Sequence, residues 1–341
     1  MIKQKIYSLQ VFRGFAALSV AIFHSALYLN QYHQNIPDSV YQFFRFGQFG
    51  VDFFFVLSGF IIFYAHFETS KGFNPAKKYL LKRLIRIFPA YLPISICLLL
   101  LASYSQAMVS DYSVWSSLLL IPDDKKPILG VAWTLIHEMI FYLIFLLFFF
   151  SKRFFYFFLI IWTISNITLN GNFQESGLGY YFNILNIEFL LGILCAWIFL
   201  NAKLNKNKGL FFTICGVILF IFSYCLFVNQ EEYFHNLYLA FGFALIILGF
   251  VILENTTSLN FSKLLIELGN SSYSLYLIHT PLISLFMKSG FMSNYFEHYY
   301  ITIFLLTTFS VIFGFFYYSF WEMPSLEFLR AKMRQYFRTY N

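Results

Sequence analysis

LQVFRGFAALSVAIFHSALYL, residues 9–29, has the length and apolarity of a membrane-spanning helix. Arg13 nevertheless lies near one end of this stretch, and His24 lies near the other. Ionisable side chains inside a bilayer are costly, and where they occur they usually face a protein interior or a water-filled cavity. The stretch therefore predicts a membrane helix whose polar side chains have a function.

The same apolar character extends along nearly the whole chain. Of its 341 residues, 59% are hydrophobic, 23% aromatic and 11% charged, which excludes a water-soluble globular protein. This pattern predicts an all-α, polytopic membrane protein with about ten transmembrane helices. We expect one membrane-embedded domain over residues 1–341, with spans from 7 to 321 and a short basic cytoplasmic tail at 322–341. The expected spans cover residues 7–29, 49–67, 86–106, 132–150, 153–169, 181–200, 209–228, 236–254, 272–290 and 299–321.

The basic residues between these spans predict the orientation. If the N-terminus is cytoplasmic, 18 lysines and arginines fall on the inner side and 4 on the outer side. Because cytoplasmic loops carry an excess of positive charge, we expect both termini in the cytoplasm. The net charge of +7 then reflects topology and contact with membrane lipids, and nucleic-acid binding is not expected. The four outer residues are Arg45, Lys125, Lys126 and Lys288.

Arg13 and His24 share one face of the first span. They are 11 residues apart, which is about three helical turns plus 20° and about 16 Å of rise. Between them lie the small residues Ala17, Val20 and Ala21. This line of small residues indicates either close packing of a neighbouring helix or a slot for a thin ligand. His24 itself can be a base or a buried hydrogen-bonded residue, and Arg13 can also extend to the lipid headgroups.

Asp52 opens the second span, in the segment GVDFFFVLSGF at residues 50–60. It is expected at the same depth as His24 in the antiparallel first helix. A carboxylate there can fix the tautomer of an imidazole and favour its charged form during proton transfer. The competing interpretation is an acidic residue that interacts with the dipole of its own helix.

A basic stripe precedes the third span, in the segment KKYLLKRLIRIFPAYLP at residues 77–93. Lys78, Lys82 and Arg86 recur every fourth residue, and Arg83 lies beside them. The stripe can anchor the helix to lipid phosphates. Arginine side chains that close to Arg13 can equally hold the phosphates of a soluble cofactor.

Two later spans and the end of a third carry further polar residues. His137 and Glu138 lie in WTLIHEMIFY at residues 133–142; a zinc-protease site is excluded because Phe141 stands where the second histidine is required. Glu138 remains an inward-facing carboxylate, four residues before Tyr142. His279 lies in the ninth span. Glu322 lies at the inner end of the tenth, where a carboxylate beside Arg13 or the basic stripe is electrostatically favourable.

Taken together, these segments resemble the acyltransferase 3 family of integral membrane acyltransferases. Its hallmark is an arginine, ten residues and a histidine in the first span, which Arg13 and His24 match. Further matches are GVDFFFVLSGF, KRLIRIFP, WTLIHEMIFY, SYSLYLIH and EMP, in the family's order from the first span to the last. The stretch at residues 117–142 looks most like the branch that acetylates exopolysaccharides. Lys82 departs from the usual arginine, and Ile136–His137 departs from the usual polar-aromatic pair.

The resemblance implies a multi-pass O-acyltransferase of a bacterial inner (plasma) membrane. It implies acetyl-CoA as donor, no metal, and a sugar hydroxyl of a polysaccharide or lipid-linked oligosaccharide as acceptor. A transporter or flippase of a lipid-linked sugar is the alternative, because intramembrane ionisable residues also mark translocation paths. The expected catalytic residues are His24, Asp52 and Glu138; the cofactor-binding residues are Arg13, Arg83, Arg86 and Glu322; the substrate-binding residues are Trp133, His137, Tyr142 and His279.

Overall fold

The computed structural model describes residues 6–33, 36–104, 111–173, 175–228, 232–257, 259–289 and 298–339. The described residues are helical almost throughout and group into two compact units that alternate along the sequence. The first unit draws on residues 1–68, 184–272 and 282–310, and the second on 69–183, 273–281 and 311–341. Neither unit is a separate stretch of chain, and the single domain expected from the sequence stays a prediction. Lys3 and Lys5, counted in the topology, lie outside the described residues.

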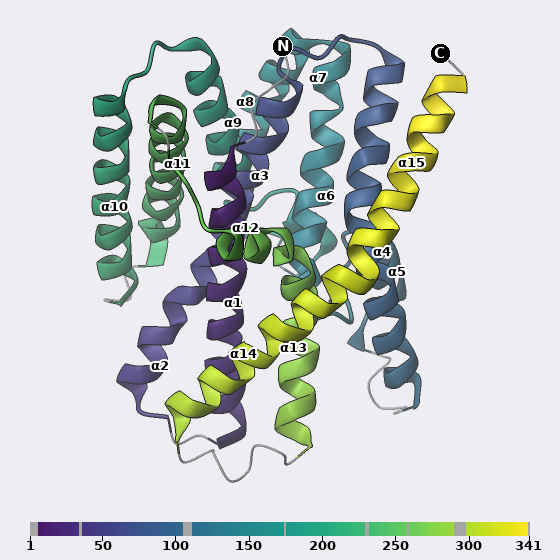
Figure 1. Ribbon diagram of the computed structural model, residues 1–341, viewed down its shortest axis with the longest axis vertical. Helices are drawn as coiled ribbons and strands as arrows, with labels where there is room; N and C mark the ends of the chain where they lie inside the picture. The colour runs from purple at the N-terminus through teal and green to yellow at the C-terminus, as the bar shows by residue number, and fades with distance from the viewer. Residues whose placement is uncertain are drawn as a thin grey trace. The chain divides into compact units, whose positions relative to one another are not determined.

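The first unit is a helical bundle around α1. In Figure 1, α10 and α11 run side by side within it. Helices α3 and α9 pack closely together, because Gly59 and Gly192 have no side chain to separate the backbones. Its elements are α1 (Tyr7–His33), α2 (Asp38–Arg45), η1 (Phe46–Phe49), α3 (Gly50–His66), α9 (Asn186–Asn201), α10 (Lys206–Val228), α11 (Glu232–Thr256) and α12 (Lys263–Asn270).

The second unit is built around the long helix α4, with the C-terminal helix α15 packed along it (Figure 1). Two helices, α13 (Ser272–Lys288) and α14 (Tyr299–Tyr317), contribute residues to both units. The predicted basic tail is helical, since α15 covers most of it. The elements are α4 (Phe73–Tyr104), α5 (Val114–Leu119), η3 (Gly130–Ala132), α6 (Trp133–Phe145), α7 (Leu147–Phe150), α8 (Lys152–Thr168), η4 (Gly177–Tyr180), the π-helix η6 (Tyr318–Glu322) and α15 (Met323–Thr339).

Helix α4 begins 13 residues before the span predicted at 86–106. Gly72, with φ of +124°, makes the turn into it, and the Gly72 carbonyl accepts the first helical hydrogen bond from the Ala76 N–H. The prediction began too late because hydropathy marks only the apolar part of a helix. The basic stripe is therefore part of α4, not a segment that precedes it.

Two prolines, Pro89 and Pro93, lie inside α4 without ending it. Pro93 has no N–H, so the carbonyl of Pro89, four residues earlier, loses its helical donor. The indole Nε1 of Trp321 donates to that carbonyl at 2.8 Å, and the Tyr317 hydroxyl donates to the Ala90 carbonyl at 2.7 Å. Side chains next to and within η6 thus satisfy the backbone groups that the prolines disturb, as membrane helices require.

Helices occupy all ten positions that the sequence predicts for spans. Seven helical stretches among the described residues are at least 18 residues long and apolar enough to cross a membrane. The helices at the other positions are α8 and α13, with 17 residues each, and α9, with 16. The chain is therefore an all-helical polytopic membrane protein, while the number of spans and the cytoplasmic termini stay predictions.

Candidate active site

His24 lies on α1 of the first unit and is partly exposed. Its Nδ1 lies 3.0 Å from the carbonyl oxygen of Val20, one turn earlier. A carbonyl can only accept, so Nδ1 carries the proton of a neutral ring and the basic nitrogen is Nε2. The backbone of α1 therefore selects the tautomer, and it presents Nε2 as the atom that takes up a proton.

The line of small residues between Arg13 and His24 is covered by protein. Ala17, Val20 and Ala21 are completely buried. At the Arg13 end, Gly14 lies against the backbone of Gly269 in α12, where an added Cβ would come within 2.9 Å of the amide nitrogen. Of the two interpretations of this line, close helix packing is the one that these contacts describe.

Asp52 is buried in α3, and its side chain hydrogen-bonds to that of Glu188 at the start of α9. The close approach of α3 and α9 brings the two carboxyl groups together, and the rings of Phe55 and Phe189 stack beside them at 4.6 Å. Two carboxyl groups that share a hydrogen bond require a proton on one of them. The partner of Asp52 is thus Glu188, where the sequence suggested His24.

Arg86 and Glu322 form a salt bridge in the second unit. The Glu322 side chain is completely buried, and its second oxygen accepts a hydrogen bond from the Ser274 hydroxyl at 2.6 Å. The Arg86 guanidinium also lies over the Tyr273 ring, 4.9 Å from its centre. One ion pair therefore ties α4 to η6 and, through Ser274, to α13. The sequence suggested a cation near Glu322, from Arg13 or from the stripe, and the stripe supplies it.

Arg83 lies between two tyrosine rings. Its guanidinium is 5.6 Å from the centre of the Tyr79 ring and 5.6 Å from that of Tyr142. Its buried Nε has no hydrogen-bond partner among the described residues. The Tyr142 hydroxyl donates to Glu138 at 2.5 Å. This arrangement holds a cation, a phenol and a carboxylate next to one another on α4 and α6.

The candidate substrate-binding residues form an aromatic group at the start of α6. The Trp133 ring meets that of His137 edge to face at 5.8 Å, and His137 lies 5.1 Å from the ring of Tyr180. His137 is almost completely buried, whereas Trp133 is partly exposed. Aromatic walls with a few polar atoms are typical of small-molecule sites.

His279 belongs to a neighbouring chain of contacts. It is completely buried, its Nδ1 lies 3.1 Å from the Leu275 carbonyl, and its ring lies 5.7 Å from that of Tyr276. The Tyr276 hydroxyl is 2.8 Å from that of Thr134, in the first turn of α6. Because no part of His279 is exposed, these contacts describe a residue that supports α6 from α13.

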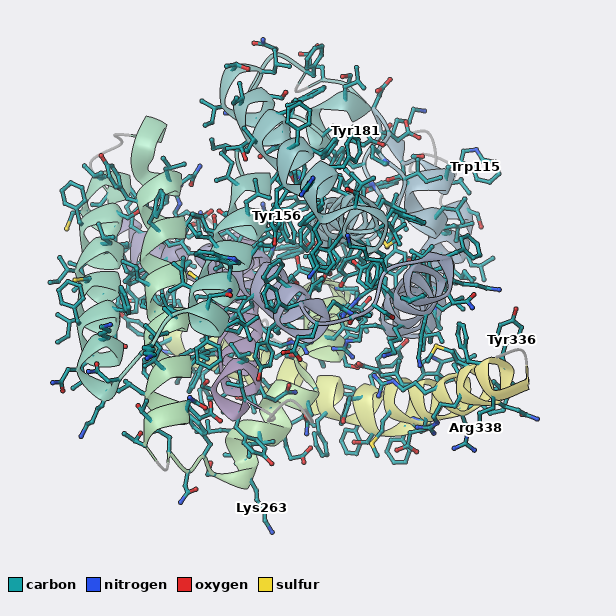
Figure 2. The ribbon with its side chains drawn as sticks, turned by 90° about the horizontal axis from the view of Figure 1, so that it is seen from above. Trp115, Tyr156, Tyr181, Lys263, Tyr336 and Arg338 are labelled. Atoms are coloured by element: carbon teal, nitrogen blue, oxygen red, sulfur yellow. The ribbon has the colours of Figure 1, made fainter. Side chains whose placement is uncertain are left out.

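A folded loop precedes this aromatic group. Ser113 caps α5 and donates to Asp123, and this hydrogen bond holds the pKa of the Asp123 carboxyl below its usual value. Asp124 accepts from the N–H of Gly177, just before Tyr180. Figure 2 shows Trp115 of α5 pointing outward, where it is 67% exposed. The loop thus contacts η4, which carries Tyr180, and leads into α6, which carries Trp133 and His137.

The structure gathers the expected site residues in two sets. The first unit holds Arg13, His24 and Asp52, and the second holds Arg83, Arg86, Trp133, His137, Glu138, Tyr142, His279 and Glu322. Sequence reasoning missed Tyr79, Glu188, Tyr273 and Ser274. Glu188 carried a usable signal, since it is an acidic residue at the start of an apolar run; the other three become visible only through their partners. Among the described residues, no group of three or more His, Cys, Asp or Glu side chains is placed to hold a metal ion.

Comparison with known proteins adds a family. A family model described as an acyltransferase domain matches residues 6–333. The chain is also similar to the exopolysaccharide production protein ExoZ of Rhizobium meliloti (strain 1021), with 25% identity over 262 residues. The aligned region covers 72% of this chain and 80% of that protein. No solved structure matches the chain significantly.

Proposed function

Because the chain belongs to the acyltransferase 3 family, we propose that it moves an acetyl group from acetyl-CoA to a hydroxyl of a cell-surface polysaccharide or of its lipid-linked precursor. The name of the R. meliloti relative, an exopolysaccharide production protein, supports a polysaccharide as the acceptor class. We propose that the protein lies in the inner (plasma) membrane of a bacterium. Acyltransferase membership favours this function over a transporter or flippase of lipid-linked sugars.

The proposal depends most on the exposure and the tautomer of His24. Of the three histidines that the sequence suggested for the site, His137 and His279 are almost or completely buried, whereas His24 is partly exposed. The contact of Nδ1 with the Val20 carbonyl assigns the lone pair of the neutral ring to Nε2. A partly exposed histidine with a defined basic nitrogen is what general base catalysis requires.

The proposed reaction is a single acyl transfer. His24 Nε2 takes the proton of the acceptor hydroxyl while that oxygen attacks the thioester carbonyl of the donor. A carbon–oxygen bond forms, the carbon–sulfur bond breaks, and the CoA thiolate leaves and takes the proton back from the imidazolium. Atoms and charges balance without a metal or an oxidant. Asp52, which shares a proton with Glu188, and Glu138, which accepts from Tyr142, complete the proposed catalytic set.

The donor would bind through its phosphate groups. Arg83 is the arginine of the stripe whose Nε has no hydrogen-bond partner among the described residues, so it is the proposed first contact with a phosphate oxygen. Arg86, which is bonded to the buried Glu322, lies at the buried end of the basic stripe on α4. Arg13 is the proposed third cation for the donor. On the acceptor side, Trp133 and His137 offer aromatic surface for a sugar ring.

The test uses purified protein in lipid nanodiscs with radiolabelled acetyl-CoA. The wild type should release labelled acetate slowly without acceptor, and it should label a polysaccharide extracted from its own host. Mass spectrometry of the surface glycans, with and without the gene, identifies the acceptor and the acylated position. Glycans with the same acyl groups in both strains, together with no acetate release, would contradict the proposal.

A further inference from the structure

Helix α15 returns the C-terminal segment to the basic side chains of α4. The Lys77 ammonium donates to the Tyr336 hydroxyl at 2.7 Å, and the Lys78 ammonium lies 5.7 Å from the centre of the Phe337 ring. At the other end of α15, the Trp321 indole of η6 is bonded to the Pro89 carbonyl. Figure 2 shows Tyr336 and Arg338 near the far end of this helix. Because α15 is attached to α4 at both ends, the side chains between those attachments have fixed neighbours.

Those neighbours are mostly other cations. Lys82 interacts electrostatically with Lys78, Arg83 and Arg330, and all three of these interactions are repulsive. Arg330 interacts in turn with Arg86 and Arg334, which repel it, and with Glu322, which attracts it. We call this set the α4–α15 basic cluster; it consists of Lys78, Lys82, Arg83, Arg86, Arg330 and Arg334.

Among the described residues, two carboxylates lie beside the six cations of the basic cluster. Glu322 is bonded to Arg86 and Ser274, and Glu138, which accepts from Tyr142, lies next to Arg83. Like charges that lie close together repel one another, and the repulsion rises as water is excluded from between them. A fold that brings Arg330 close to Lys82 and Arg86 therefore gains stability when an anion with several negative charges binds between them.

The exposure of the cluster indicates how such an anion would lie. Lys78, Lys82, Arg330 and Arg334 are exposed, Arg83 is partly buried between two tyrosine rings, and Arg86 is 21% exposed beside the buried Glu322. Lipid headgroups would meet the exposed members. The partly buried Arg83, whose Nε has no partner among the described residues, would instead meet a ligand that enters among the helices. Guanidinium groups also match phosphate oxygens two at a time.

We infer that Arg330 and Lys82, together with Arg83, bind the phosphate groups of the acyl donor, so that the C-terminal helix forms one wall of the donor site. This inference rests on the proposed function. It assigns a ligand to a segment that the sequence presents as a basic tail. The donor is then held by two helices far apart in the sequence, α4 and α15, and not by the stripe on α4 alone.

The experiment measures binding of coenzyme A, without an acetyl group, to the full-length protein in nanodiscs. The variants are Arg330→Gln, Lys82→Gln and the matched control Lys332→Gln, which removes a cation of α15 that lies over the Phe328 ring. Each cluster variant should raise the Kd for coenzyme A about tenfold, the size expected for one charge-assisted hydrogen bond. The control should stay within about twofold of wild type, as for an exposed charge outside a site.

Nanodiscs of phosphatidylcholine alone and nanodiscs that contain phosphatidylglycerol separate the two sources of phosphate. Loss of coenzyme A affinity in both membranes supports the donor site. Unchanged affinity in both, or a loss confined to one lipid composition, would overturn it and leave the cluster as a headgroup site. Acetate release by the wild type is measured in parallel. A wild type that releases acetate, with cluster variants that bind coenzyme A normally, refutes the inference and leaves the proposed function intact; a wild type without any acyl transfer refutes the function itself.

Discussion

The guanidinium of Arg86 is bonded to the carboxylate of Glu322, which is 236 residues later in the chain and completely buried. Breaking a buried ion pair by removing one partner leaves an uncompensated charge. This pair therefore holds α4 to η6 in a way that a surface pair does not.

Replacing one partner of this ion pair should destabilise the protein. Arg86→Ala should lower the free energy of unfolding by about 3–5 kcal/mol, because Glu322 then stays buried and unpaired. The double variant Arg86→Met, Glu322→Leu should recover most of that loss, since it leaves no charge behind. Thermal unfolding in detergent measures both, with Arg153→Ala at the exposed start of α8 as control. An Arg86→Ala protein as stable as the control would show that the pair contributes nothing.

His24→Ala should lower the rate of acetyl transfer by about 10²- to 10⁴-fold, the usual contribution of a general base. His24→Asn should be equally inactive, because an amide can hydrogen-bond but cannot take up a proton. Protein level and coenzyme A affinity should stay close to wild type in both. Transfer to the native glycan is the measurement, with immunoblots for expression. Activity in the Asn variant near that of wild type would make His24 a packing residue and would direct the search for the base to Glu138 or His137.

Arg83→Ala should raise the KM for acetyl-CoA. We expect about a tenfold increase, from the loss of one charge-assisted hydrogen bond. The KM of Arg83→Lys should lie between those of Arg83→Ala and wild type. An ammonium keeps the charge, but it lacks the planar fork that contacts phosphate and the tyrosine rings. Initial rates at varied donor concentration give the KM, again with Arg153→Ala for comparison. Equal KM values in all four proteins would leave Arg83 as a structural cation.

Glu188→Gln should be tolerated, whereas Glu188→Leu should not. The glutamine amide can donate to Asp52 as a protonated carboxyl does, so stability should stay near that of wild type. Leucine leaves Asp52 buried without its partner, which should cost about 1–3 kcal/mol of stability. Chemical unfolding in mild detergent compares the two variants. If the leucine variant is the more stable one, the carboxyl contact with Asp52 is not a stabilising interaction.

Both termini and the segment around Lys77 should face the cytoplasm, from the distribution of basic residues. Reporter fusions at residue 1, after residue 71 and at residue 341, made with one reporter active only in the cytoplasm and one active only outside it, measure this directly. The outer segment near Lys125 serves as the opposite control. A terminus found outside would reverse the orientation and move the basic cluster away from cytoplasmic coenzyme A.

The sequence predicted the helical, polytopic architecture and the family, because apolar length and the order of polar motifs are local properties. The family model over residues 6–333 confirms that resemblance. The boundaries of α4 were less predictable, since its first turns are charged and hydropathy does not register them. The partners of the polar residues were least predictable. That Asp52 meets Glu188, and that Arg86 meets Glu322, depends on which helices approach one another, and no local pattern encodes this.

The π-helix η6 has a genetic consequence. A π-helix accommodates one residue more than the α-helix it interrupts. Deleting one codon within residues 318–320 should therefore close the bulge and let the chain continue as a regular α-helix, with the later side chains close to their present directions. A one-codon deletion in the α-helical part of α15, between η6 and Arg330, would instead turn every later side chain by about 100°. Arg330 would then face away from Lys82, although its own codon is unchanged. In this part of the gene, a single in-frame deletion should be tolerated better within the π-helix than in the α-helical turns that follow it.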